Sequence, residues 1–303
     1  MSHSHSQHKS NFLQDFILGG TAGAISKTIS APLERVKLLL QTQDSNKQLA
    51  GKKYKGVADC FVRSFREEGL LSFWKGNWAN ILRYFPTTAF NFAFKDFFQR
   101  TFNKYDSKTQ PYWFLFGNIM AGGSAGACCM LIVYPLDFAR TRLGVDIGRK
   151  GHTQFNSLTH CLTSILRTDG IRGLYNGVGV SLISIFSYRG MYFGFFDTGK
   201  RLIPDYNNRP FFIKFLFAQI ITMFSETVNY PFDTVRRRMM MNSGLEKPIY
   251  SSTTECFRMV AKNEGMKGFF KGNFSNMLRS ISSSLVLVLY DHFQAEFTKK
   301  MGR

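Results

Sequence analysis

One motif occurs three times in this sequence and constrains its fold more than any other feature. The motif reads Pro-x-(Asp/Glu)-x-x-(Arg/Lys), and its copies lie about 100 residues apart at Pro32–Lys37, Pro135–Arg140 and Pro231–Arg236. An apolar stretch precedes each copy, so we expect each motif at the end of a long helix that proline bends, with acid and base on one face. A repeat at this interval predicts one domain of three similar units.

Two further patterns follow each copy in the same order. The first is an acid-glycine pair, with a cysteine eight residues before the acid, and then a turn that ends in glycine. The cysteines are Cys60, Cys161 and Cys256, and the turn glycines are Gly76, Gly177 and Gly272. The second pattern ends each unit with Asp96 and Gln99, Asp197 and Lys200, and Asp291 and Gln294. Patterns that recur in register along almost the whole chain indicate a threefold fold.

These patterns resemble those of the mitochondrial carrier family. The run Arg236–Met241, which reads Arg-Arg-Arg-Met-Met-Met, is similar to that of the ADP/ATP carrier branch. The resemblance implies an all-α membrane protein whose six transmembrane helices form three pseudo-symmetric repeats, each with a short interfacial helix. It also implies exchange of ADP for ATP across the mitochondrial inner membrane by alternating access, without enzymatic activity. A carrier of another anionic solute, or a proton leak, would use the same gates and stays open as an alternative.

The units can be placed along the chain. We expect a disordered tail over residues 1–11 and one carrier domain over 12–298, with repeats at about 12–105, 112–204 and 209–298. The long helices are predicted at Leu13–Gln41, Trp78–Phe102, Tyr112–Val145, Gly179–Leu202, Arg209–Met241 and Phe274–Phe297. The short helices are predicted at Val57–Glu67, Ser157–Arg167 and Thr253–Lys262. Lysine and arginine gather in the loop after the first long helix of each unit, which predicts that these loops face the matrix.

Composition limits the possible partners. The formal net charge of +19 calls for anionic partners, namely nucleic acid, anionic lipid or a charged solute. A mean hydropathy of −0.13 leaves open a basic soluble protein that binds RNA. The threefold repeat and the 32 phenylalanines argue against that alternative, so we expect a membrane protein that does not bind nucleic acid. The chain has no Cys-x-x-Cys pair, phosphate-binding glycine loop or nucleophile–base set, so we expect neither a metal site nor hydrolysis.

The motif acids and bases are predicted to form a gate on the matrix side. In a threefold bundle each acid can reach the base of another repeat, which predicts the pairs Glu34–Arg140, Asp137–Arg236 and Asp233–Lys37. Gln41 follows Lys37 by one turn and could brace a pair. The resemblance implies a cytoplasmic gate of Asp96 with Lys200, Asp197 with Gln294, and Asp291 with Gln99. Because glutamines replace two bases there, we expect a weaker cytoplasmic gate.

The substrate site is predicted midway along the helices. Eight residues beyond the turn positions Lys75, Asn176 and Lys271 lie Arg83, Ser184 and Arg279, at one height in three helices. Two guanidinium groups at that height can hold a polyphosphate. The resemblance assigns phosphate and adenine contacts to Lys27, Arg83, Arg279 and Tyr188 and places Ile185 in the adenine pocket. It also implies that Arg237 and Arg238 are needed for transport, with Arg237 among the substrate-binding residues. Ser184 stands where that branch usually has glycine.

Glu226 departs from the family pattern, which usually has glycine at its position. We expect its carboxylate to face the cavity, to pair with Lys27 when substrate is absent, and to lower the affinity for nucleotide. The alternative is that Glu226 points to a neighbouring helix and hydrogen-bonds there.

A lipid site is predicted at the glycine turns. The turns that contain Gly76, Gly177 and Gly272 precede helix N-termini, whose free backbone N–H groups suit phosphate. The resemblance implies that the lipid is cardiolipin and that the carrier is a monomer.

Overall fold

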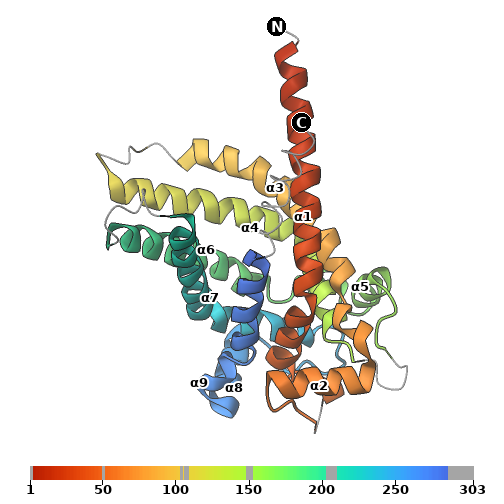
Figure 1. Ribbon diagram of the computed structural model, residues 1–303. Coiled ribbons are helices and arrows are strands. Elements are labelled where there is room, and N and C mark those ends of the chain that lie inside the picture. The colour runs from red at the N-terminus through yellow and green to blue at the C-terminus, as the bar shows by residue number, and fades with distance from the viewer. Residues whose placement is uncertain are drawn as a thin grey trace.

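The computed structural model describes residues 3–49, 52–102, 105, 109–147, 153–202 and 210–285. Within these ranges the chain is helical and contains no strand (Figure 1). A long helix with an internal proline begins each repeat, namely α1 (His3–Thr42), α4 (Pro111–Gly144) and α7 (Phe211–Asn242). The prolines are those of the three motifs, Pro32, Pro135 and Pro231.

A short helix and a second long helix complete each repeat. The short helices are α2 (Val57–Glu68), α5 (Leu158–Leu174) and α8 (Thr253–Glu264), accompanied by η1 (Lys47–Leu49), η2 (Leu70–Trp74) and α9 (Met266–Phe269). The second long helices are α3 (Asn77–Phe102), α6 (Val178–Leu202) and the helical segment 273–285. A kink at Gly170, whose φ is +66°, divides α5 into two parts that correspond to α8 and α9.

The motif-bearing ends of the proline helices gather at one end of the molecule with the short helices. Figure 1 shows α2, α8 and α9 at the bottom and the N-terminal part of α1 extending away from them. The same view shows α3 and α4 running side by side toward the left. The closed part of the bundle is therefore the part that contains the three motifs.

Three small cores hold this end together, one for each repeat. Each contains one of the repeated cysteines, Cys60, Cys161 or Cys256, which are fully buried. The run of three methionines at the end of α7 is divided among the cores. Met241 packs in the first core, Met240 in the second and Met239 in the third. The end of α7 thus contributes apolar contacts to all three repeats.

The N-terminus differs from the prediction. A disordered tail was expected over residues 1–11 and a helix start near Leu13, but α1 begins at His3. No proline or glycine occurs between His3 and Leu18, so nothing in this stretch interrupts the helix. Extending an existing helix costs far less free energy than starting one, because nucleation is the unfavourable step.

In the described part of the chain, α4 is the helix whose length and composition suit a membrane span. Its most apolar 18-residue window has a mean hydropathy of 1.7. Other long helices carry charged residues along their length, such as Lys27 in α1 and Arg83 in α3. Such residues lower the average hydropathy of a helix even where they point into a protein interior.

Candidate functional site

A ring of three ion pairs joins the motif ends of α1, α4 and α7. The pairs are Glu34 with Arg140, Asp137 with Arg236, and Asp233 with Lys37. In the last pair, Lys37 Nζ lies 2.8 Å from Asp233 Oδ2, and no side chain in the ring is more than 20% exposed. These are the pairings that the sequence predicted. Each crosses from one repeat to another, so the ring ties the three proline helices together.

Gln41 lies beside the Asp233–Lys37 pair. Its Nε2 donates hydrogen bonds to Asp233 Oδ2 at 3.2 Å and to Thr234 Oγ1 at 3.0 Å. The predicted brace is therefore present on this pair. The corresponding positions of the other repeats hold Gly144 and Met240, which cannot make such a bond.

Arg237 belongs to the ring rather than to a cavity. Its Nη1 donates to Asp137 Oδ2 at 3.1 Å and to Thr141 Oγ1 at 2.5 Å, and its Nε lies 3.6 Å from Asp233 Oδ1. The resemblance implied substrate binding by Arg237, but the residue lines neither of the two cavities described below. In this arrangement its guanidinium group helps to compensate the negative charges of Asp137 and Asp233, which lie away from water.

A further cluster of charges, which the sequence analysis missed, ties the third repeat to the first. Glu264 binds Arg238 and also Lys271 Nζ, which lies 2.6 Å from Glu264 Oε2. Lys271 also lies 2.6 Å from Asp44 Oδ2, in the loop after α1. The equivalent contacts in the first repeat are those of Glu68 with Arg35 at 2.8 Å and with Lys75 at 2.7 Å. The spacing of seven residues from each acid to its lysine recurs in the first and third repeats and was visible in the sequence.

Asp44 is expected to stabilise the folded chain through this cluster. Burial would raise the pKa of its carboxyl, but hydrogen bonds from Lys271 and Lys53 outweigh burial and lower the pKa to about 2. The stabilisation is therefore complete above pH 3.8, the ordinary pKa, and is lost as the pH falls through about 2. At pH 7, Asp44→Asn should lower the midpoint of thermal unfolding in detergent by about 2–6 °C. The difference from wild type should disappear on acidification, whereas the exposed Glu67→Gln should change little at either pH.

Two cavities lie next to the ring and share one wall. The first has a volume of about 290 Å³ and is lined by Arg83 of α3 together with residues of α4, α6 and α7. The second has a volume of about 200 Å³ and is lined by Arg279 together with residues of α1, α6 and α7. Ser184, Tyr188 and Asn229 line both. Ile185 lines the first cavity only.

Ser184 is held by a residue that the sequence analysis did not single out. Asn229 of α7 donates from Nδ2 to Ser184 Oγ at 2.7 Å and to the Ser184 carbonyl oxygen at 3.2 Å. Asn229 is 8% exposed. The hydroxyl that replaces the usual glycine is thus hydrogen-bonded to α7, and this contact forms part of the wall between the two cavities.

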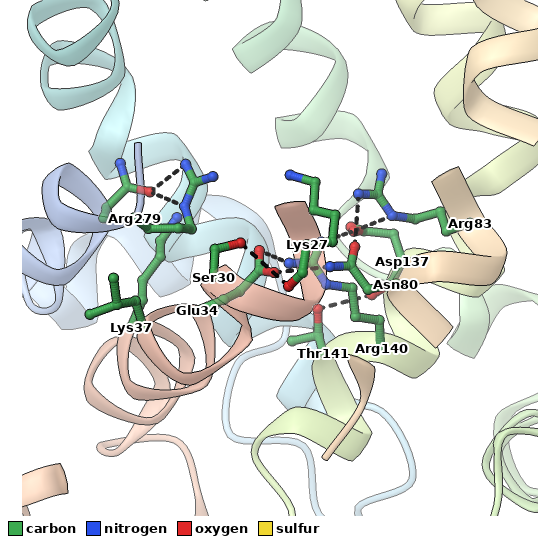
Figure 2. Close-up of polar contacts among 12 residues, drawn as sticks. Lys27, Ser30, Glu34, Lys37, Asn80, Arg83, Asp137, Arg140, Thr141 and Arg279 are labelled. Atoms are coloured by element: carbon green, nitrogen blue, oxygen red, sulfur yellow. Dashed lines mark hydrogen bonds and ion pairs between the residues drawn. The ribbon is translucent and has the colours of Figure 1, made fainter. Parts of the chain in front are cut away.

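The predicted phosphate-binding cations converge from three helices. Figure 2 shows Arg279 on one side, Arg83 on the other, and Lys27 between them. Arg83 Nε lies 3.8 Å from Asp137 Oδ1, and the side chains of Arg83 and Arg279 are 21% and 16% exposed. The Lys27 ammonium makes no hydrogen bond or ion pair within the described residues. Arg83 lines the first cavity and Arg279 the second, whereas Lys27 lies between the two arginines and lines neither cavity.

Glu226 lines the second cavity and at the same time hydrogen-bonds to a neighbouring helix, which was the alternative to its pairing with Lys27. Its Oε1 lies 3.4 Å from Arg279 Nη2, and its Oε2 accepts a hydrogen bond from Asn276 Nδ2 at 2.8 Å. The expected pair with Lys27 is not formed. The reason is that Arg279 and Asn276 lie one turn apart on the segment 273–285 and together offer two donors to one carboxylate.

The predicted cytoplasmic ring is described only in part. Asp96 and Gln99 lie on α3 and Lys200 on α6, and both Asp96 and Lys200 are exposed. Asp96 forms no ion pair within the described part of the chain, so the predicted Asp96–Lys200 contact is absent here. The side chain of Asp197 and the residues Asp291 and Gln294 lie outside the described residues. The matrix ring is thus closed while this cytoplasmic contact is open.

The three turn glycines sit where one repeat meets the gate helix of another. Their φ angles are +79° at Gly76, +86° at Gly177 and +84° at Gly272, a region that favours glycine. A Cβ atom would lie 2.9 Å from the Arg140 carbonyl oxygen at Gly76, 3.0 Å from that of Arg236 at Gly177, and 2.9 Å from that of Lys37 at Gly272. Each glycine therefore allows a helix start to pack directly against the backbone of a gate base.

Replacing Gly76 by alanine should destabilise this packing. The substitution combines an unfavourable φ angle with a contact too short for carbon and oxygen, and we expect a cost of about 1–3 kcal/mol. A lower midpoint of thermal unfolding in detergent would show it. Gly56→Ala is the matched control, because its φ is 174° and nothing lies within 4 Å of an added Cβ. Equal midpoints for the two variants would contradict the prediction.

Comparison with known proteins identifies the family. The model of the family described as mitochondrial carrier protein matches residues 8–106, 114–207 and 207–301. The chain belongs to the mitochondrial carrier family, whose members are transporters of the mitochondrial inner membrane and not enzymes.

Relatives place the chain more narrowly within that family. It is 51% identical over 289 residues to ADP/ATP translocase 2 of Bos taurus, which covers 94% of this chain and 97% of the relative. It is 51% identical over 296 residues to ADP/ATP translocase 4 of Homo sapiens, which covers 97% of this chain and 94% of the relative. It is also 50% identical over 297 residues to the mitochondrial substrate carrier family protein ancA of Dictyostelium discoideum, and the match covers 97% of this chain and 96% of the relative.

Proposed function

We propose that this chain exchanges ADP for ATP across the mitochondrial inner membrane by alternating access. The observation that carries the proposal is the placement of Arg83 and Arg279 on two cavities that share Tyr188, directly beside a closed ring of ion pairs. Its similarity to ADP/ATP translocases over nearly the whole chain supports the same substrates. The family match leaves no support for the alternative of an RNA-binding protein.

The carrier is a monomer whose six long helical segments span the membrane around a pseudo-threefold axis. Three helix–short helix–helix repeats support this arrangement, and the basic loops support an orientation in which the end that holds the ring faces the matrix. The substrate site then lies between the two ends, where it can open to either side in turn.

The ring of Glu34–Arg140, Asp137–Arg236 and Asp233–Lys37 acts as the matrix gate. Ion pairs taken out of water gain attraction but lose hydration, so their net contribution to stability is small. That near balance suits contacts that must break and re-form in each cycle. In the state that is closed to the cytoplasm, Asp96 pairs with Lys200, Asp197 with the amide of Gln294, and Asp291 with the amide of Gln99. Two amides in place of bases make this gate the weaker one.

Lys27, Arg83 and Arg279 hold the phosphates, while Tyr188 and Ile185 contact the adenine ring. Guanidinium groups bind phosphate through two parallel hydrogen bonds, and an aromatic ring offers a face for base stacking. Because ATP carries one more negative charge than ADP, each exchange moves one net charge. A membrane potential of 100 mV would then bias the direction by about 2.3 kcal/mol.

Anionic lipid, with cardiolipin as the proposed species, binds at the turns of Gly76, Gly177 and Gly272. The first N–H groups of a helix have no carbonyl partner within the helix and attract phosphate. In this chain those helix starts lie against the gate bases, so bound lipid would support the closed matrix ring. No metal or other cofactor is part of the proposal. Raised thermal stability on adding cardiolipin, without a similar effect of zwitterionic lipid, would support it.

Counter-exchange in liposomes tests the proposed function. Vesicles that contain the purified protein are loaded with ADP, and uptake of labelled ADP, ATP, other nucleotides and small anions is measured. We expect uptake of ADP and ATP that requires nucleotide inside the vesicle. Uptake of another anion, or proton flux without nucleotide uptake, would instead support a carrier of a different solute or a proton leak. Protein-free vesicles provide the background.

A further inference from the structure

Glu226 brings a negative charge into a site built for an anion. It lies on α7, five residues before Pro231, and lines the cavity of about 200 Å³ together with Arg279 and Asn276. The carboxylate is 22% exposed and is oriented by two contacts from the segment 273–285. Asn276 Nδ2 donates to one oxygen at 2.8 Å, and Arg279 Nη2 lies 3.4 Å from the other.

A carboxylate and a phosphate present the same chemistry to a guanidinium group, because both offer two oxygens and negative charge. Glu226 therefore occupies the part of Arg279 that a phosphate would use. We propose that Glu226 is an internal counterion which the nucleotide must displace from Arg279, and that it sets how strongly the affinity depends on the number of phosphates. This inference rests on the proposed exchange of adenine nucleotides.

The other cations of the site are not blocked in the same way. Arg83 lies 3.8 Å from Asp137, but Asp137 is already shared with Arg236 and with Arg237 at 3.1 Å. The Lys27 ammonium makes no hydrogen bond or ion pair within the described residues. An incoming phosphate can therefore bind Lys27 and Arg83 without displacing a closely bound carboxylate. It can bind Arg279 only after Glu226 has moved away from the guanidinium group.

The displaced carboxylate remains inside the cavity. Lys27 lies between Arg83 and Arg279 (Figure 2) and makes no ion pair within the described residues, so it is the cation to which the free carboxylate can turn. Its negative charge then competes with the phosphates for Lys27 and repels them. Repulsion between like charges increases with the charge on the ligand, so ATP is opposed more than ADP.

Two substitutions separate the charge of Glu226 from its shape. Glu226→Gln keeps the length of the side chain and an oxygen that can accept from Asn276, but it removes the charge. Glu226→Asp keeps the charge. The KM values for labelled ADP and labelled ATP are measured for uptake into vesicles loaded with ADP. Glu246→Gln, which replaces an exposed acid in the loop after α7, is the matched control.

For Glu226→Gln we expect the KM for ADP to fall about threefold and the KM for ATP to fall about tenfold. Glu246→Gln should stay within about twofold of wild type for both nucleotides. Glu226→Asp, which keeps the negative charge, should keep the wild-type ratio of the KM for ATP to the KM for ADP. Unchanged KM values in Glu226→Gln, or an equal fall for the two nucleotides, would overturn the inference while leaving the proposed function intact. Failure of the proposed function would appear differently, because the wild-type protein itself would not exchange ADP and ATP.

Discussion

Exchange of ADP for ATP should fall by at least 100-fold when Arg279 is replaced by alanine. The substitution removes the guanidinium group that lines the second cavity, and a hydrogen-bonded charge of this kind contributes on the order of 3 kcal/mol to binding or to a transition state. It also leaves the carboxylate of Glu226 without its cation, so that a negative charge faces the incoming phosphates. Both effects act in the same direction. The measurement is the initial rate of nucleotide uptake into ADP-loaded vesicles.

Three further variants test whether the loss is specific to Arg279. Arg279→Lys keeps the charge but cannot form two parallel hydrogen bonds, so we expect an intermediate rate. Arg258→Ala removes an exposed arginine from α8 and should leave the rate within about twofold of wild type. Adding Glu226→Gln to Arg279→Ala should restore part of the lost rate, because it removes the uncompensated charge. A rate for Arg279→Ala within about threefold of wild type would show that Arg279 does not bind the substrate.

Replacing Asp137 by asparagine should cause the largest loss of stability among the residues of the ring. Asp137 is 3% exposed and lies among four arginines, with Arg236 and Arg237 in direct contact and Arg140 and Arg83 at 3.7 and 3.8 Å. Removing its charge leaves these guanidinium groups close together with too few acids. Breaking a buried ion pair in this way costs about 3–5 kcal/mol.

Thermal unfolding in detergent provides the measurement. For a chain of this size, we expect the midpoint for Asp137→Asn to fall by roughly 6–15 °C. Glu67→Gln is the matched control, because Glu67 is an exposed acid on α2 that lies 3.6 Å from Arg63 of the same helix. That variant should change the midpoint by no more than about 2 °C. Similar midpoints for the two variants would mean that Asp137 does not hold the ring together.

The sequence was sufficient to predict the ring because repetition supplied the missing geometry. An acid and a base three residues apart share one face of a helix, whatever the fold. When the same pair recurs after a proline in three repeats, a closed arrangement leaves each acid near the base of another repeat. Glu34, Asp137 and Asp233 then have predictable partners. The glycine turns were equally visible, although their contact with the carbonyl oxygens of the gate bases was not.

The individual, non-repeated residues could not be predicted in this way. Glu226 has no acidic counterpart in the other repeats. The sequence therefore left open whether it faces the cavity or a neighbouring helix, and it did not identify Arg279 and Asn276 as its partners. Arg237 was expected at the substrate and lies among the gate acids. Asp44 and Asn229 each have a partner in another repeat, Lys271 and Ser184, that no repeated motif indicates.

The sequence by itself thus determined the threefold architecture, the ring and the height of the substrate arginines. Only the tertiary structure decided which cations are already paired and how Met239, Met240 and Met241 divide among three cores. The physical reason is the range of the interactions. Spacing along a helix determines which residues share a face, whereas the rotation and close packing of neighbouring helices determine what that face meets.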